Sequence, residues 1–222
     1  MTSLGSLVRT RQPFERDDVT TRSCARYRCM DRECELELVK RLKAGDAGAF
    51  DAVHDEFNGR LYTFLARLMR SRERAEDLLE ETWLRLVTHA ARLQPDTRLG
   101  PWLFTVARNL YVSHCRSRML EEAYVNDGIG LWPPAPSSSP FEETAANELE
   151  ARVETALASL RPMYREALLL VAVEGLEPSE AAEICGISAT TMRQRLKRAR
   201  DLLARRLGNT RRAPALLHEE KA

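Results

Sequence analysis

Residues 177–206 read EPSEAAEICGISATTMRQRLKRARDLLARR and predict two helices joined by a tight turn. Glu177 is placed to cap the first helix, and Pro178 suits its first turn because the missing N–H removes no hydrogen bond there. Gly186 adopts a left-handed conformation at low cost and therefore ends this helix. Ser188 supplies a hydroxyl to cap the second helix.

The second helix has two contrasting faces. Met192, Leu196, Ala199 and Leu203 recur at spacings of three and four, the period of a buried helical stripe. The opposite face is made of hydroxyls, an amide and cations. Its candidate contact residues are Thr190, Thr191, Arg193, Gln194, Arg195, Lys197 and Arg198.

A helix-turn-helix with such a face is suited to duplex DNA. A helix fits the major groove, where arginine can bind guanine O6 and N7 and Gln194 can pair with adenine. The other cations would contact phosphates, which fix the register without reading sequence. An ordinary basic surface helix is the alternative, but the turn glycine, the two caps and the short first helix favour DNA binding.

The composition is typical of a folded protein with a wet surface. Of the 222 residues, 44% are hydrophobic and 30% are charged, and the formal net charge is only +1. Any DNA affinity must therefore come from local segregation of charge. No apolar run is long enough to cross a membrane, so we expect no membrane insertion. The N-terminus lacks the apolar core of a secretory signal, and we expect a cytoplasmic protein.

The chain divides into two helical domains, because apolar residues follow helical spacing and no strand-like alternation occurs. Prolines, serines and glycines between the domains cannot sustain a helix and predict a flexible linker. The predicted segments are a basic disordered arm (1–32), a first all-α domain (33–120), the linker (121–147), a second all-α domain (148–208, with the helix-turn-helix at about 178–200) and a disordered tail (209–222).

Five cysteines, an odd number in a chain without an export signal, indicate free thiols. Cys24, Cys29 and Cys34 are spaced C-x4-C-x4-C, which fits a zinc site poorly, so incidental thiols are favoured over a redox or metal switch. We expect no metal and no cofactor. Met30, just before the first clear helix, leaves a second start site open.

Three stretches together resemble the extracytoplasmic-function (ECF) subfamily of the sigma-70 RNA polymerase sigma factors. They are AFDAVHDEFNGRLYTFLARLMRSRERAEDLLEETWLRLV (49–87), PWLFTVARNLYVSHCRSRM (101–119) and ALASLRPMYREALLLVAVEGLEPSEAAEICGISATTMRQRLKRARDLLARRL (156–207). The resemblance covers most of the chain beyond Glu33. It implies that the first domain is sigma region 2, that the second is region 4, and that the linker runs through the polymerase.

The resemblance also implies partners and site residues. Core RNA polymerase would bind region 2 through the clamp helices of its largest subunit and contact region 4 through its flap. The corresponding docking residues here are Asp77, Leu78, Glu80, Glu81 and Trp83. A carboxylate-rich helix needs a basic partner, and Leu78 would add apolar contact because exposed ion pairs contribute little.

Promoter DNA is the second implied partner. Region 2 would capture the −10 element as a single strand, using Arg98, Arg108, Asn109, Tyr111, His114 and Arg116. Leu99, Gly100 and Pro101 replace the aromatic and arginine common in the family, and Trp102 is expected in the core. Region 4 would read the −35 element with the second-helix residues named above. An anti-sigma factor is the third expected partner.

Two other function classes are weaker. A simple helix-turn-helix repressor or activator would need a dimerisation or ligand-sensing domain, and the first domain has no pocket signature. An enzyme is disfavoured because His114 and Cys115 are adjacent on a helix and therefore point apart. Phosphate-loop and metal-binding helix motifs are also missing from the sequence.

Overall fold

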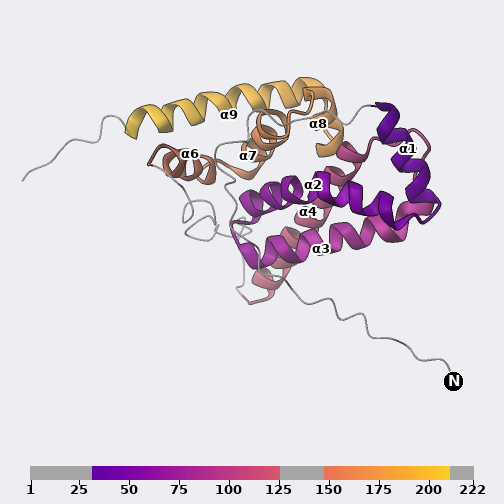
Figure 1. Ribbon diagram of the computed structural model, residues 1–222. Coiled ribbons are helices and arrows are strands. Elements are labelled where there is room, and N and C mark those ends of the chain that lie inside the picture. Colours follow the sequence, from indigo (N-terminus) through magenta and orange to yellow (C-terminus); the bar gives the residue numbers. More distant parts are fainter. Residues whose placement is uncertain (1–31, 126–147, 211–222) are drawn as a thin grey trace, which may run out of the picture.

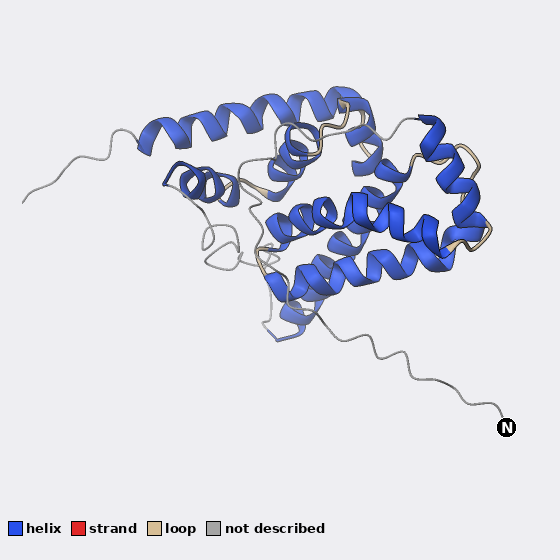
Figure 2. Ribbon diagram, viewed as in Figure 1, coloured by secondary structure: helices blue, strands red, loops and turns tan. Residues whose placement is uncertain are grey.

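The computed structural model describes residues 32–125 and 148–210, and all elements in these two ranges are helices (Figures 1 and 2). The first bundle consists of α1 (Arg32–Lys43), α2 (Ala47–Met69), α3 (Arg72–His89), the 3₁₀ turn η1 (Ala90–Arg92) and α4 (Leu99–Val125). The second consists of α6 (Glu148–Ala158), α7 (Pro162–Leu168), the π-helical turn η2 (Leu169–Val173), α8 (Pro178–Cys185) and α9 (Ala189–Thr210). The predicted all-α class is confirmed.

Helix α4 extends further than the sequence predicted. Residues 121–125 were placed in the linker but are helical, since the first glycine or proline after them is Gly128. Arg32 of the predicted arm and residues 209–210 of the predicted tail are helical too. The rest of the predicted linker, arm and tail lies outside the described residues. Cys24 and Cys29 lie outside them too.

Helices α2, α3 and α4 pack around a shared apolar core. Phe64 and Phe104 are fully buried and meet edge to face, with ring centroids 5.3 Å apart. Leu65, Leu86 and Leu103 fill the space around them with no exposed surface. This core fixes α3 and α4, the two helices that carry the region 2 candidates, relative to each other.

Two carboxylates organise the ends of these helices. Asp46 caps α2 by accepting a hydrogen bond from the backbone N–H of Gly48 at 2.8 Å. Glu35, on α1, accepts a hydrogen bond from the backbone N–H of Leu99 at 2.7 Å. A side chain 64 positions earlier thus satisfies the start of α4.

The turn η2 supplies core residues of the second bundle. The π turn brings Leu169 and Leu170 inward together, both fully buried. Gly175 then ends the segment with φ of 70°, as the sequence predicted. Helices α7 and α8 lie between α9 and the first bundle (Figure 1). The apolar cores of the two bundles are continuous, because Ala167, Leu170 and neighbouring residues belong to the same cluster as Phe104.

In the two described ranges, we find no helix with the length and apolar character needed to span a membrane.

Candidate nucleic-acid and polymerase interface

The helix-turn-helix has the predicted local geometry. Glu177 is the N-cap of α8, and its backbone N–H donates to Glu180 Oε2 at 3.0 Å. Gly186 ends α8 with φ of 63°. Ser188 Oγ then accepts a hydrogen bond from the backbone N–H of Thr191 at 3.2 Å, which caps α9. The caps and the turn that the sequence predicted are confirmed.

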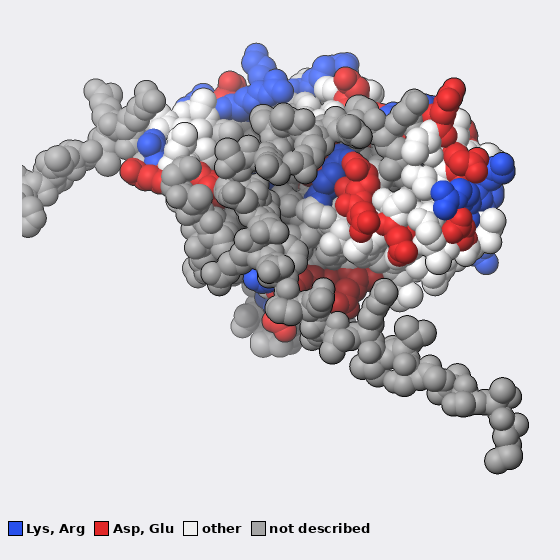
Figure 3. All heavy atoms as spheres, viewed as in Figure 1, with Lys and Arg blue, Asp and Glu red and all other residues white. Residues whose placement is uncertain are grey.

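The two faces of α9 separate as expected. Met192, Leu196 and Ala199 are buried. Five predicted DNA contacts are exposed and two are half-buried; the exposed set is Thr190, Arg193, Gln194, Lys197 and Arg198, and the half-buried pair is Thr191 and Arg195. Lysine and arginine side chains gather along the edge of the molecule formed by α9 (Figure 3). The apolar face is used for packing, so the basic face remains available to a duplex.

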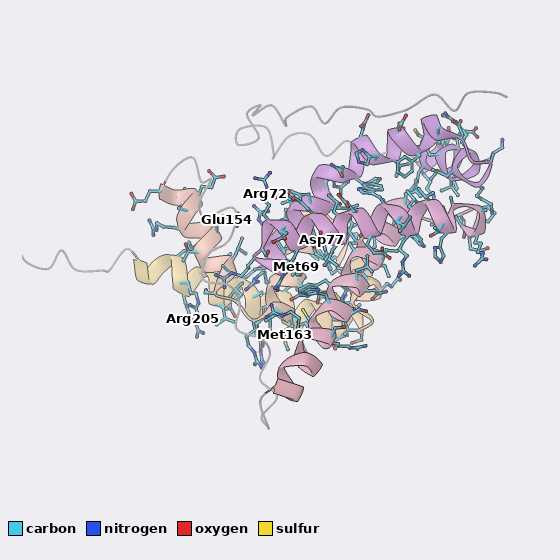
Figure 4. All side chains as sticks on the ribbon, turned by 90° about the horizontal axis from the view of Figure 1, so that it is seen from below. Met69, Arg72, Asp77, Glu154, Met163 and Arg205 are labelled. Atoms are coloured by element: carbon cyan, nitrogen blue, oxygen red, sulfur yellow. The ribbon has the colours of Figure 1, made fainter. Side chains whose placement is uncertain are left out.

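The acidic candidates lie on α3. Asp77 and Glu80 are exposed, whereas Leu78 and Glu81 are half-buried. Asp77 lies near the N-terminal end of α3, close to Arg72 in the view from below (Figure 4).

Trp83 does not share their exposed position. It is buried, its Nε1 donates to Asn58 Oδ1 at 3.0 Å, and its ring contacts Phe50 edge-on at 5.9 Å between centroids. In this structure Trp83 is a core residue, only 8% exposed, that holds α3 against α2.

Sequence reasoning missed two apolar residues beside the acidic face. Leu84 and Val87 keep 55% and 58% of their surface exposed. They follow Glu80 at i+4 and i+7 and therefore lie on the same side of α3. The sequence did carry a signal for this surface, because large apolar residues occur at helical spacing from the exposed carboxylates. Exposed aliphatic side chains next to carboxylates are typical of a protein-binding surface.

The α4 candidates divide between two sides of the helix. Asn109 and Arg116 are exposed and His114 is half-buried. Asn109 lines a hollow of about 240 Å³ between the end of α3 and α4, together with Trp102 and His89. Trp102 is partly buried and packs on the core, as predicted.

Tyr111 is on the other side of α4 and is buried. Loss of water around its hydroxyl raises its pKa well above the usual value, with a further contribution from Cys115. Arg165 and Glu166 of the second bundle also lie close enough to act on its ionisation. In this conformation Tyr111 presents no ring to a base.

Two arginine candidates are paired with glutamates of the second bundle. Arg108 Nε donates to Glu166 Oε1 at 2.6 Å, and both side chains are largely buried. Arg98, in the loop before α4, forms an ion pair with Glu180 of α8. Both arginines thus contact carboxylates from the other half of the chain.

Two more ion pairs join an arginine of the first bundle to a glutamate of the second. Arg60 Nε lies 3.0 Å from Glu174 Oε2, and Arg67 Nη2 lies 2.6 Å from Glu154 Oε1. Glu154 on α6 faces the end of α2 near Met69 (Figure 4). We call the first-bundle residues the interdomain arginines (Arg60, Arg67, Arg98 and Arg108) and their partners the facing glutamates (Glu154, Glu166, Glu174 and Glu180). In every one of these pairs the cation comes from the first bundle.

The environment of Glu174 shows how closely the bundles are packed. Its side chain is only 3% exposed, and burial raises its pKa despite the opposing effect of Arg60. The Arg60 guanidinium itself lies over the Phe57 ring, 5.1 Å from the centroid.

Arg165 of α7 provides a contact with the backbone of the first bundle. It is buried, and its Nη1 donates to the carbonyl oxygens of Arg67 at 3.2 Å and Leu68 at 3.5 Å. These carbonyls belong to the last turn of α2, where cations are favoured. The same guanidinium donates to the carbonyls of Leu157 and Leu160. Arg165 therefore connects the ends of α2 and α6.

The described part of the chain holds no group of three or more histidine, cysteine or acidic residues arranged for a metal ion. Its cysteines are free thiols, with Cys34 exposed and Cys115 and Cys185 buried. Burial is the main cause that raises the pKa of Cys185 to about 12, and nearby Glu166 adds to it. The predicted free thiols are confirmed for these three residues.

Comparisons with known proteins agree with both domains. The Sigma-70 region 2 family matches residues 54–120, and the Sigma-70, region 4 family matches residues 150–203. The ECF RNA polymerase sigma factor EcfG of Rhodopseudomonas palustris is 38% identical over 65% of this chain and 77% of its own length. The sigma factor CarQ of Myxococcus xanthus is 32% identical over 77% of this chain and 95% of its own.

Solved structures share the fold. The sigma factor RpoE of Bartonella quintana, crystallised with the anti-sigma factor NepR, aligns with a TM-score of 0.55 and 28% identity, covering 81% of this chain and 98% of that one. CnrH, solved with the cytosolic domain of CnrY, aligns with a TM-score of 0.61 and 21% identity over 79% of this chain and 97% of that one. The helical bundles, the helix-turn-helix and these matches together place the chain in the sigma-70 family, as an ECF RNA polymerase sigma factor with regions 2 and 4.

Proposed function

We propose that this sigma factor binds core RNA polymerase through α3 and directs it to promoters by reading the −35 element with α9 and the −10 element with α4 and its preceding loop. The observation that carries the proposal is the exposed polar face of α9, which combines Arg193, Gln194 and Lys197 on a helix packed by its other side. Arginine and glutamine on such a face are the side chains that read base edges in the major groove.

Docking on polymerase is assigned to the exposed side of α3. Asp77 and Glu80 supply charge, and the exposed side chains of Leu84 and Val87 supply apolar area. The combination favours a basic helical partner with an apolar stripe, as the clamp helices of the largest subunit would provide. Charge guides such an encounter, while buried apolar contacts supply most of its affinity.

Control by an anti-sigma factor follows from the likeness to RpoE of Bartonella quintana, which was crystallised with one. An anti-sigma factor bound to this chain would keep it from polymerase.

Promoter-specific transcription tests the function. Transcripts that appear on overexpression identify candidate promoters, and these are then transcribed in vitro with core polymerase. We expect initiation at those promoters only when this chain is added. A chain that adds nothing to core initiation but still binds duplex DNA would be a simple helix-turn-helix regulator.

A pair of charge reversals tests the docking surface. Asp77→Lys with Glu80→Lys should weaken core polymerase binding at least about tenfold, since like charges across an interface repel. The matched control reverses two exposed carboxylates on other helices, Glu33→Lys with Asp51→Lys. Core affinity, measured by fluorescence anisotropy, should fall only for the α3 variant; equal affinities would remove α3 from the docking site.

A further inference from the structure

Helix α1 contacts the backbone of the loop that leads from η1 into α4. Arg32 Nη2 donates to the carbonyl oxygen of Asp96 at 2.7 Å, and Lys43 Nζ donates to the carbonyl oxygen of Leu93 at 2.6 Å. Arg32 and Lys43 are the first and the last residues of α1. The helix therefore lies along the loop and holds it by two carbonyl groups (Figure 2).

Glu35 joins these contacts to the start of α4. Its Oε1 accepts from the N–H of Leu99 at 2.7 Å, and its Oε2 accepts from Arg32 Nη1 at 2.6 Å. The carboxylate is buried, and a buried charge needs such partners. It also lies at the N-terminal end of α4, where the helix dipole favours an anion. Together, Arg32 and Glu35 fix the backbone on either side of Arg98, at Asp96 and Leu99.

We propose that Arg32, Glu35 and Lys43, which we call the loop frame, are positioning residues for −10 readout. They hold the backbone of residues 93–99 so that its exposed side chains meet the bases of the separated promoter strand. The inference rests on the proposed −10 role of this loop. An amide, a carboxylate and a guanidinium can each pair with the edge of an unstacked base. The side chains that supply these groups are Gln94, Asp96 and Arg98, all exposed.

The loop frame does more than cap a helix. Glu35 by itself would satisfy the N–H of Leu99. The carbonyls of Leu93 and Asp96 lie before the start of α4, so the contacts from Arg32 and Lys43 act on the loop. All of these contacts reach backbone atoms of the loop, and the frame therefore leaves its side chains for recognition. A loop held in this way loses less conformational entropy when it binds a strand.

Helix α1 gives the frame a rigid base. Leu38, Val39 and Leu42 are buried in the apolar core that α1 shares with the rest of the first bundle. Functional groups supported by packed helices are placed more precisely than groups on loops. Residues 94–96, in contrast, are exposed, so the placement of the loop depends on the frame.

Strand selection by the assembled holoenzyme tests the frame. One probe is a single-stranded oligonucleotide with the −10 sequence of a promoter that this chain activates in vitro, and the other carries the same bases in permuted order. Fluorescence anisotropy gives the ratio of the two affinities. The frame variant is Arg32→Ala, and the matched control is Lys40→Ala, which removes another exposed cation of α1.

We expect Arg32→Ala to lower this ratio by about threefold to tenfold, the usual range for the loss of one hydrogen bond. Lys40→Ala should keep the parent ratio, and Arg32→Lys, which retains a charged donor, should recover part of it. Affinities for core polymerase and for −35 duplex should stay at the parent values in all three variants. An equal loss of core affinity in Arg32→Ala would indicate general unfolding and overturn the positioning role.

A double-mutant cycle distinguishes positioning from stability. Asp96→Ala removes a side chain that the frame presents but keeps the carbonyl that Arg32 binds. It should lower the ratio in the parent chain and have much less effect in the Arg32→Ala background, where the loop is no longer held. Amide hydrogen exchange of residues 93–99, followed by mass spectrometry, should be faster in Arg32→Ala than in Lys40→Ala.

The outcomes separate the frame from the function on which it rests. Unchanged strand selection in Arg32→Ala, absence of coupling between Arg32 and Asp96, or unchanged hydrogen exchange would each overturn the frame and leave the −10 role standing. A parent holoenzyme that binds both oligonucleotides equally would overturn the −10 role of the loop, and the frame with it.

Discussion

Helices α4 and α9 are both arginine-bearing and both proposed to contact DNA, yet they differ in what they present. The polar side of α9 is open to solvent along Arg193, Gln194 and Lys197. On α4, Arg108 is bound by Glu166 and Tyr111 is buried, while Asn109 on the other side stays exposed. A basic helix therefore offers a DNA-binding surface only where its cations are not paired with carboxylates of the same chain.

The largest expected effect concerns the two faces of α9. Met192 is fully buried, so Met192→Ala should destabilise the fold by about 2–5 kcal/mol through lost burial and the cavity left behind. Gln194→Ala on the exposed face should change stability by less than about 0.5 kcal/mol. Urea denaturation followed by circular dichroism compares them. Similar losses for both would mean that α9 packs on both faces and is not free to enter a groove.

The next effect concerns DNA readout by α9. Arg193→Ala should weaken binding to the −35 element by about 1–3 kcal/mol and relax sequence preference if the residue contacts a base edge. Arg205→Ala, also exposed but further along α9, serves as the control and should change affinity less. Binding is measured by anisotropy on matched and mutated duplexes. A loss that is equal on all sequences would reassign Arg193 to phosphate contact.

A smaller effect is expected at the start of α9. Ser188→Ala removes the hydroxyl that accepts from Thr191 and should reduce stability by about 1 kcal/mol, the usual value of an N-cap. Ser188→Asp keeps an acceptor at the same position and should restore most of the loss. Thermal unfolding of the three chains provides the measurement. If the alanine and aspartate variants melt together below the parent, the cap is not the cause.

The smallest effect distinguishes the buried thiols of α4 and α8 from the exposed thiol of α1. Cys185 and Cys115 are buried with raised pKa, whereas Cys34 is exposed, so iodoacetamide at pH 8 should modify Cys34 first. The folded state holds the Cys185 proton more tightly than an ordinary thiol does. Its contribution to stability is therefore complete below the ordinary pKa of 9.0 and lost as the pH rises toward about 12. Mass spectrometry of tryptic peptides follows each site; early modification of Cys185 would show that the helix-turn-helix opens locally.

The sequence predicted the helix-turn-helix closely because its determinants are local. A proline at the first turn, a glycine with positive φ and a serine cap act over a few residues, and each is where the sequence placed it. The apolar period of α9 similarly fixed which side would be buried. For Trp83 the helical spacing predicted a core position, while the family resemblance implied a docking surface. The structure buries it against Asn58 and Phe50.

Contacts between distant residues could not be read in the same way. The sequence marks Arg98 and Arg108 as candidate DNA contacts but gives no sign that the interdomain arginines pair with the facing glutamates. The pairing joins positions as far as 114 residues apart. The π turn at Leu169 could not be predicted either, because its sequence is an ordinary run of apolar residues.

The N-terminal caps of α9 and α4 show the difference between local and long-range contacts. The cap of α9 follows from local sequence, because Ser188 and the N–H of Thr191 lie three residues apart and backbone geometry brings them together. The cap of α4 depends on tertiary packing, because Glu35 comes from another helix. The same packing brings Arg108 to Glu166. Such long-range pairs depend on how whole helices pack, and packing is a property of the assembled core.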